Sequence, residues 1–161
     1  MNRKPLIGLG VWAGLAQVVA GVAMYVAGVY FAPWSMFVNL SLLLFAIVVG
    51  TKWYAARYLN GKITYLQALG VGIVISISTG VIYAIYNLIS ISWLYPNFLD
   101  DVVRSRMAQP SIAGTPSFAA MRAEVSALGI AVPNLIRLSV FGSILSLLTS
   151  LFLKQRTRHL P

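Results

Sequence analysis

Few residues in this sequence could support acid–base or metal chemistry, because it contains three acidic residues, one histidine and no cysteine. Asp100, Asp101 and Glu124 share one polar segment, and their carboxylates could together bind a divalent cation. Arginines lie close to all three, and Asp100 is expected to pair with Arg104 one helical turn later. We therefore interpret the acidic residues as parts of a solvated, charge-matched segment, and we predict no metal site and no cofactor.

Nucleophilic and phosphate-binding motifs are incomplete in this sequence. The single histidine, His159, lies near the carboxyl end, and the predicted topology places it across a bilayer from all three acidic residues. A Ser-His-Asp arrangement cannot form across about 30 Å of hydrocarbon. The dipeptide Gly61-Lys62 suggests a phosphate-binding loop, but that motif needs glycine at Ala56 and serine or threonine at Ile63. We therefore predict no catalytic residues and a protein that is not an enzyme.

Three polar side chains are better candidates for a binding site. Arg137 lies inside a long apolar segment, where an ionised side chain usually marks function. Asn39 and Asn87 are expected at a similar depth, in the outer half of the membrane. We interpret Asn39, Asn87 and Arg137 as a candidate vestibule for an anionic headgroup or a small anion, roofed by residues 97–129. The alternative is ordinary helix packing, with Arg137 extending to the headgroups.

The elements that must position these residues are membrane-spanning helices. Of the 161 residues, 59% are hydrophobic and only 9% are charged, and the mean hydropathy is +0.83. Soluble domains have about 25% charged residues. The net charge of +9 would suggest nucleic acid as a partner of a soluble protein. Here the cations lie in short clusters at the ends of apolar runs, which favours anionic lipid headgroups instead.

The hydropathy pattern predicts an all-α polytopic membrane protein with one domain, residues 1–161. Four transmembrane helices are expected over about residues 6–31, 35–56, 64–94 and 133–153, with an extracytoplasmic loop over 95–132. The loop is expected to be partly helical and amphipathic, with one helix beginning near Asn97 and a breaker-rich connector over 109–116. Thr115 is expected to cap a second loop helix that ends at Gly129, and Pro133 to open the last span.

Small residues recur along one face of each of three predicted spans. In the first span the glycines follow steps of three and four residues, and Gly10-x-x-x-Gly14 is a common pattern of close helix packing. On the same face, Gln17 is expected to hydrogen-bond across a helix interface rather than to line a pore. The packing neighbour could be the same chain or a second copy. The residues predicted to pack in this way are Gly10, Gly14, Gln17, Gly21, Gly28, Gly72, Ser76, Gly80, Ser139, Gly142, Ser143 and Ser146.

The distribution of basic residues predicts the orientation. The amino end carries two cations, the turn between the second and third spans carries three, and the carboxyl end carries three. Four spans place these eight positive charges on one side, whereas the other side carries one net positive charge. Both termini are therefore expected to be cytoplasmic. The basic anchors of the central turn are Lys52, Arg57 and Lys62.

The block from Arg57 to Ala68 (RYLNGKITYLQA), which two apolar spans precede, resembles an uncharacterised bacterial family, the domain of unknown function 4199. The start of the long loop, Tyr95 to Leu99, and the basic end of the chain are similar too. The resemblance extends over nearly the whole chain. It implies a four-helix bacterial membrane protein, and it brings no catalytic residues with it. We separately predict that the protein lies in the bacterial inner (cytoplasmic) membrane.

Two hypotheses for the function follow from the sequence. The first is a non-enzymatic packing or accessory subunit of a homo-oligomer or a larger membrane complex, which the stripes of small residues suggest. The second is a small transporter, channel, or lipid- or anion-binding protein, of which a transporter or channel would need a continuous polar path. The expected partners are the lipid bilayer and either a second copy or another membrane protein, and not nucleic acid.

Overall fold

The computed structural model describes residues 3–95, 97–108 and 117–153, and within these ranges the chain is helical without strands. The four long helices are α1 (Lys4–Val26), α2 (Ser35–Tyr58), α3 (Tyr65–Ile89) and α6 (Ala127–Leu153). A π-helical turn, η1 (Ser90–Leu94), extends α3. The two short helices are α4 (Phe98–Met107) and α5 (Phe118–Glu124). Each long helix is apolar and long enough to cross a bilayer, so the predicted all-α, four-span, multi-pass class is confirmed.

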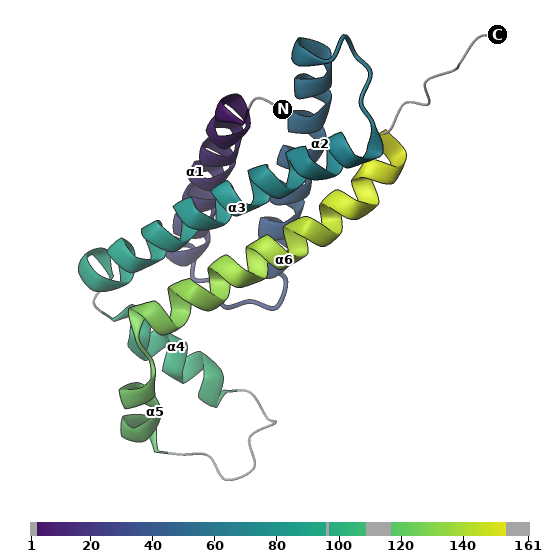
Figure 1. Cartoon of the computed structure of the whole chain (residues 1–161). Helices are drawn as coiled ribbons and strands as arrows, with labels where there is room; N and C mark the ends of the chain where they lie inside the picture. The colour runs from purple at the N-terminus through teal and green to yellow at the C-terminus, as the bar shows by residue number, and fades with distance from the viewer. Residues whose placement is uncertain (1–2, 96, 109–116, 154–161) are drawn as a thin grey trace, which may run out of the picture.

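The bundle is organised around α3, which contacts α1, α2 and α6 (Figure 1). Helices α3 and α6 run antiparallel side by side, and α1 and α2 cross behind them. Half of the most apolar stretch of α3 is buried inside the protein, against 22–28% in the other three spans. The other spans therefore present most of their apolar surface outward, where lipid replaces water as the solvent.

Glycine and serine alternate across the interface between α3 and α6. Gly72 of α3 lies against Ser146 of α6, and a Cβ added at Gly72 would come within 2.7 Å of the Ser146 Cβ. Ser76 of α3 lies against Gly142 of α6 in the same way. Both serine hydroxyls donate to a carbonyl of their own helix, four residues earlier, at 2.7 Å. The interface is therefore packed by close backbone approach, with its hydroxyls already satisfied.

The glycine stripe of α1 lies against α3 of the same chain. A Cβ added at Gly10 would lie 2.8 Å from the Ile75 carbonyl oxygen, and one added at Gly14 would lie 2.7 Å from the Ile82 Cβ. The Thr79 hydroxyl donates to the Gly10 carbonyl at 3.1 Å, which ties the two backbones together. Helix α3 of the same chain is therefore the neighbour against which Gly10 and Gly14 pack.

The remaining small residues of the predicted stripes have mixed positions. Gly21 faces the Tyr83 ring and hydroxyl, and Gly80 faces Leu135 and Leu138 of α6. Ser139 and Ser143 of α6 are only partly buried, and the Ser143 hydroxyl donates to the Ser139 carbonyl at 2.7 Å.

Helix α1 ends at Val26, about five residues before the predicted end. Gly28 follows with a φ of +73°, a conformation that glycine adopts without the steric cost of a side chain. A Cβ added there would meet nothing within 4 Å. Gly28 therefore serves the turn after α1 and not helix packing, contrary to the prediction, because hydropathy does not detect a backbone turn inside an apolar run.

Helix α6 begins at Ala127, so Pro133 lies inside the helix and does not open it, contrary to the prediction. The Ser126 hydroxyl accepts a hydrogen bond from the Gly129 N–H at 3.0 Å, a cap that starts the helix earlier. Pro133 has no N–H to donate to the carbonyl of Gly129, so one helical hydrogen bond is missing in the first turns of α6. As a result Arg137 lies ten residues into α6, about 15 Å along its axis.

Helices α4 and α5 pack beyond one end of α3 and α6 (Figure 1). We call this end of the bundle the outer end and the end with the α2–α3 turn the inner end, as labels for the two ends. The two short helices enclose a small apolar core together with η1 and the residues that precede α6. Its buried members are Ile91, Phe98, Val102, Val103, Met121 and Val125. An ion pair of 2.6 Å joins Asp100 of α4 to Arg122 of α5, so Asp100 pairs with Arg122 and not with Arg104 as predicted. The pair is about one third exposed and contributes little stability.

The second predicted loop helix is divided in the structure. Thr115 and the 109–116 connector lie outside the described residues. Ser117 caps α5, its hydroxyl accepting the Ala120 N–H at 3.3 Å. Helix α5 then ends at Glu124 instead of continuing to Gly129, because the chain is extended at Val125 before α6 begins.

The three basic anchors are exposed where α2 ends: Lys52 and Arg57 lie in the last turns of α2, and Lys62 lies in the turn that follows. The chain reverses through Asn60 and Gly61, which have φ values of +51° and +78°. Thr64 then caps α3 by exchanging hydrogen bonds with Gln67, at 3.0 and 3.4 Å. The Gly61-Lys62 dipeptide is therefore part of a turn that leads into a helix cap, and not of a phosphate-binding loop.

We predict that Gly10→Ala lowers the free energy of unfolding by about 1–3 kcal/mol, because the added methyl group would push the α3 backbone away. The matched control is Gly8→Ala on the same helix, where an added Cβ meets nothing within 4 Å. The control should be neutral, or stabilising by up to about 1 kcal/mol from helix propensity. Unfolding of the solubilised protein in a denaturing detergent, followed by circular dichroism, measures both. Equal effects of the two substitutions would contradict close packing at Gly10.

Candidate functional site

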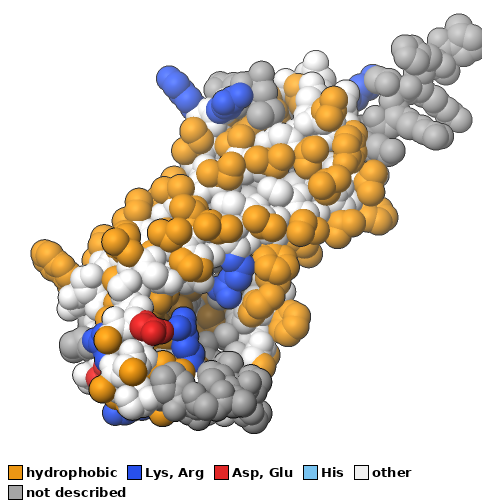
Figure 2. Space-filling view, turned by 60° about the horizontal axis from the view of Figure 1, so that its bottom comes forward, with side chains coloured by type: hydrophobic (Ala, Val, Ile, Leu, Met, Phe, Trp, Pro, Cys, Tyr) orange, Lys and Arg blue, Asp and Glu red, His pale blue; other side chains and the backbone are white. Residues whose placement is uncertain are grey.

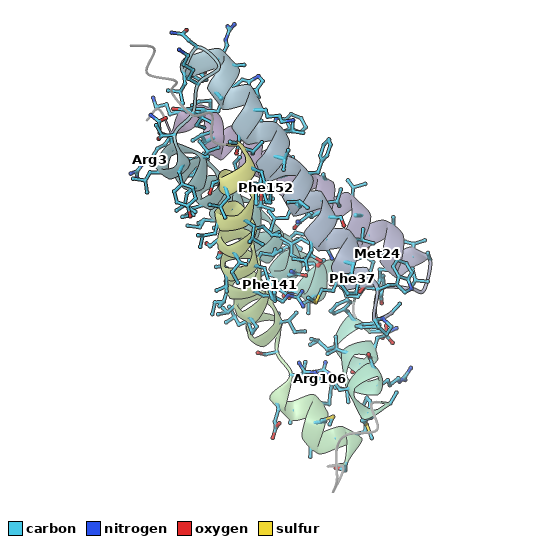
Figure 3. All side chains as sticks on the ribbon, turned by 90° about the vertical axis from the view of Figure 1, so that its right-hand side faces the viewer. Arg3, Met24, Phe37, Arg106, Phe141 and Phe152 are labelled. Carbon is cyan, nitrogen blue, oxygen red and sulfur yellow. The ribbon has the colours of Figure 1, made fainter. Side chains whose placement is uncertain are left out.

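A cavity of about 290 Å³ lies between the outer end of the bundle and helix α4. Its walls come from the turn after α1, the start of α2, the outer half of α3, α4, and the first part of α6. Figure 2 shows basic side chains in the recess between the spans and the outer helices, and Figure 3 shows Arg106 on α4, beyond Met24 of α1. The polar residues that line the cavity are Tyr30, Ser35, Asn39, Tyr83, Arg106, Asn134 and Arg137.

Two arginines from different helices contribute to this cavity. Arg137 of α6 donates from Nη2 to the Asn134 side-chain oxygen at 2.9 Å, which leaves most of its guanidinium donors free. Arg106 of α4 makes no ion pair or hydrogen bond with any residue that the structure describes. No carboxylate belongs to the described lining. The cavity therefore carries two positive charges that the surrounding described side chains do not neutralise.

The acidic residues that could neutralise these arginines are engaged elsewhere or exposed. Asp100 pairs with Arg122, and Asp101 accepts a hydrogen bond from the Tyr25 hydroxyl at 3.0 Å. Glu124 is exposed at the end of α5. In the described ranges no group of three or more histidine, aspartate or glutamate residues could hold a metal ion. His159 lies outside those ranges.

Neutral polar groups form the floor of the cavity. The Tyr30 and Tyr83 hydroxyl oxygens are 3.4 Å apart. The Asn39 side-chain nitrogen donates to the Ser35 carbonyl at 3.4 Å, and its side-chain oxygen is buried without a partner. Below Asn39, the fully buried Gln17 donates to the Asn39 backbone carbonyl at 3.0 Å. Gln17 thus bonds across the α1–α2 interface, and its own side-chain oxygen is also unpaired.

The predicted vestibule is only partly assembled. Asn39 and Arg137 share the cavity, but Asn87 does not line it. Asn87 is 2% exposed, and its backbone carbonyl accepts a bond from the Ser90 hydroxyl. Tyr83, one turn earlier on α3, lines the cavity in its place.

Sequence reasoning missed several residues of this cavity. The sequence analysis assigned no role to Arg106, and only the position of α4 over the bundle brings it into the same cavity as Arg137. Asn134 could have been found, because it precedes Arg137 by three residues, a spacing at which helical side chains meet. Tyr30 and Tyr83 carried no sequence signal that separates them from ordinary interfacial tyrosines.

The cavity does not continue through the bundle. Leu43 and Ile47 of α2 and Ile75 of α3, all with no exposed surface, fill the middle of the core. A separate cavity of about 460 Å³ lies at the inner end, beside the buried Thr51 and the exposed Lys52. A layer of packed, mostly apolar side chains therefore separates the two cavities.

In a comparison with protein families, residues 9–155 match a family described as protein of unknown function (DUF4199). The match covers most of the chain, including all four spans apart from the first residues of α1. No curated protein and no solved structure matches the chain.

We predict that a cysteine introduced at Asn134 reacts with a water-soluble thiol reagent, whereas one introduced at Gln17 does not. Asn134 lines the open cavity, and Gln17 has no exposed surface. The natural sequence has no cysteine, so each variant reports a single site. Labelling of the solubilised protein, followed by mass spectrometry, measures the difference. Comparable labelling at Gln17 would show that water passes the packed layer and would favour a channel.

Proposed function

The chain belongs to the DUF4199 family of proteins of unknown function, and on this premise we propose that it is a non-enzymatic, anion-binding membrane protein. The ligand is a phosphate or carboxylate group, carried by a lipid headgroup or by a small anion. The observation that carries the proposal is the pair of Arg106 and Arg137 in one cavity, with no carboxylate in its described lining.

The chemistry of the cavity suits an oxyanion. Guanidinium groups present several N–H donors in a planar fork that matches phosphate and carboxylate oxygens. Two such groups beside an apolar bundle repel each other, and an anion between them removes that repulsion. The tyrosine hydroxyls and the Asn134 amide can add neutral hydrogen bonds. The volume of about 290 Å³ is at the small end of ligand pockets, which fits a headgroup or a small ion.

The position of the cavity favours a lipid headgroup. It lies beside the start of α2, where Trp34 is half exposed and Phe37 is 66% exposed. Tryptophan at this depth is typical of the membrane–water interface. A lipid could therefore place its phosphate in the cavity while its chains remain along the apolar surface of α2.

The proposed orientation keeps both termini and the α2–α3 turn in the cytoplasm, so the cavity faces outward from a bacterial inner membrane. The exposed basic residues of that turn support it. Reporter fusions to the two ends should indicate the same compartment, and opposite compartments would refute this orientation.

Binding without catalysis is part of the proposal. No histidine, aspartate, glutamate or cysteine belongs to the cavity lining in the described ranges, so no ordinary general base faces a bound ligand. Chemical turnover of bound phospholipid by the purified protein, seen by mass spectrometry, would contradict this part.

The accessory-subunit hypothesis stays a prediction. The small-residue stripes that suggested it are used within the chain, between α3 and its neighbours. A second copy or another membrane protein would have to bind the outward apolar surfaces of α1, α2 or α6. Native electrophoresis of the gently solubilised protein tests this, and migration as a bare monomer would count against it.

We predict that Arg106→Gln and Arg137→Gln each lower the retention of phosphatidylglycerol about tenfold, because each removes a charge-assisted contact with the phosphate. The control is Arg57→Gln at the inner turn, which makes the same change in net charge. Native mass spectrometry of the purified protein gives the fraction that retains lipid. Competition by inorganic phosphate distinguishes a free anion from a headgroup. Unchanged retention of phosphatidylglycerol in both cavity variants would contradict the proposal.

A further inference from the structure

A second recess lies on the other side of the Tyr30 and Phe31 side chains, which line both spaces. Its volume is about 650 Å³. It lies at the outer end of α1, against the end of η1 and one face of α4. Its lining residues are Tyr25, Val26, Gly28, Tyr30, Phe31, Tyr95, Asp101, Arg104 and Ser105. We call this space the aromatic groove.

Aromatic rings form one side of the groove. The Tyr25 ring centroid lies 4.6 Å from that of Tyr95, with an angle of 56° between the planes. It lies 6.1 Å from that of Tyr30, with an angle of 81°. Rings inclined in this way make a corner rather than a flat stack. Aromatic corners bind ammonium groups, which the negative faces of the rings attract.

Opposite charges stand next to each other in the groove without pairing. Asp101 and Arg104 are three residues apart on α4, so they occupy neighbouring positions on one face. The Tyr25 hydroxyl donates to Oδ2 of Asp101 at 3.0 Å and holds this carboxylate toward α1. Arg104 has no ion pair or hydrogen bond in the part of the chain that the structure describes. The groove therefore has a negative end beside the rings and a separate positive end.

This arrangement matches a ligand that carries both charges. An ammonium group in the groove can lie against the rings and beside Asp101, and a phosphate a short distance away can reach Arg104. The phosphoethanolamine group has this chemistry, with two carbons between its charged ends. The apolar wall continues outward through Val26, which is 78% exposed, and Phe31, which is 39% exposed. That continuation gives acyl chains a surface to follow.

We propose that the aromatic groove binds the zwitterionic headgroup of a membrane phospholipid. Asp101 and the rings of Tyr25 and Tyr95 hold the ammonium group, and Arg104 holds the phosphate. Tyr30 and Phe31 line both spaces, but the charged residues of this site are distinct from those of the anion-binding cavity, because they belong to a different face of α4 from Arg106. The two sites give the protein two headgroup preferences at the same membrane surface.

The test compares two lipids with identical acyl chains, phosphatidylethanolamine and phosphatidylglycerol, offered together to the purified protein in mild detergent. Asp101→Asn keeps the shape and the acceptor for Tyr25 but removes the charge. It should lower the retention of phosphatidylethanolamine roughly 2- to 30-fold and leave phosphatidylglycerol unchanged. Arg104→Gln, at an exposed residue, should also lower phosphatidylethanolamine without changing thermal stability.

The matched control is Arg106→Gln, which should lower phosphatidylglycerol and leave phosphatidylethanolamine unchanged. Because each variant should affect only one of the two lipids, the experiment distinguishes a failure of this site from a failure of the anion-binding cavity. Free phosphoethanolamine is added as a competitor to identify the source of the headgroup. Displacement of the lipid only at high competitor concentration supports a membrane lipid, and displacement at a comparable concentration supports the headgroup alone. Wild-type retention of phosphatidylethanolamine in both Asp101→Asn and Arg104→Gln would overturn the proposal.

Discussion

Close approach of α3 to its neighbours is the constraint on which the rest of this structure depends. In a bilayer the lipid chains are as apolar as the side chains, so helix association depends on van der Waals contact rather than on hydrophobic burial. Gly72 and Ser76 of α3 interlock with Ser146 and Gly142 of α6, and Gly10 of α1 meets the α3 backbone. Larger side chains at these positions would separate the helices and remove those contacts.

The tight bundle has a consequence for charge. The side chains buried in its middle are apolar, such as Leu43 and Ile75, or uncharged and polar, such as Ser76 and Ser146, so the ionised groups lie outside the packed core. At the outer end, one ion pair joins Asp100 to Arg122, and the Tyr25 hydroxyl engages Asp101. Arginines outnumber the remaining acidic residues at this end, and three of the arginines at this end form no ion pair with a described residue. These three are Arg104, Arg106 and Arg137, and they define the two candidate sites.

Helix boundaries show where local sequence signals compete. Apolar residues continue past Val26, so hydropathy extended the first span, whereas the backbone turns at Gly28 because glycine accepts a positive φ there. Pro133 favoured a helix start, but the Ser126 cap begins α6 earlier. The shift matters for the site, because the added turns of α6 carry Gly129 and Ile130 to the wall of the cavity.

The sequence by itself determined the membrane class, the four apolar spans, the faces that carry small residues and the excess of cations at one end. These properties depend on residue type and on spacings of a few residues, which act the same way wherever the chain goes. Only the tertiary structure decided that the stripes meet within one chain, that Asp100 pairs with Arg122, and that Asn39, Arg106 and Arg137 share a cavity. Those residues are far apart along the chain, and no local pattern links them, because their meeting depends on how the helices pack around α3.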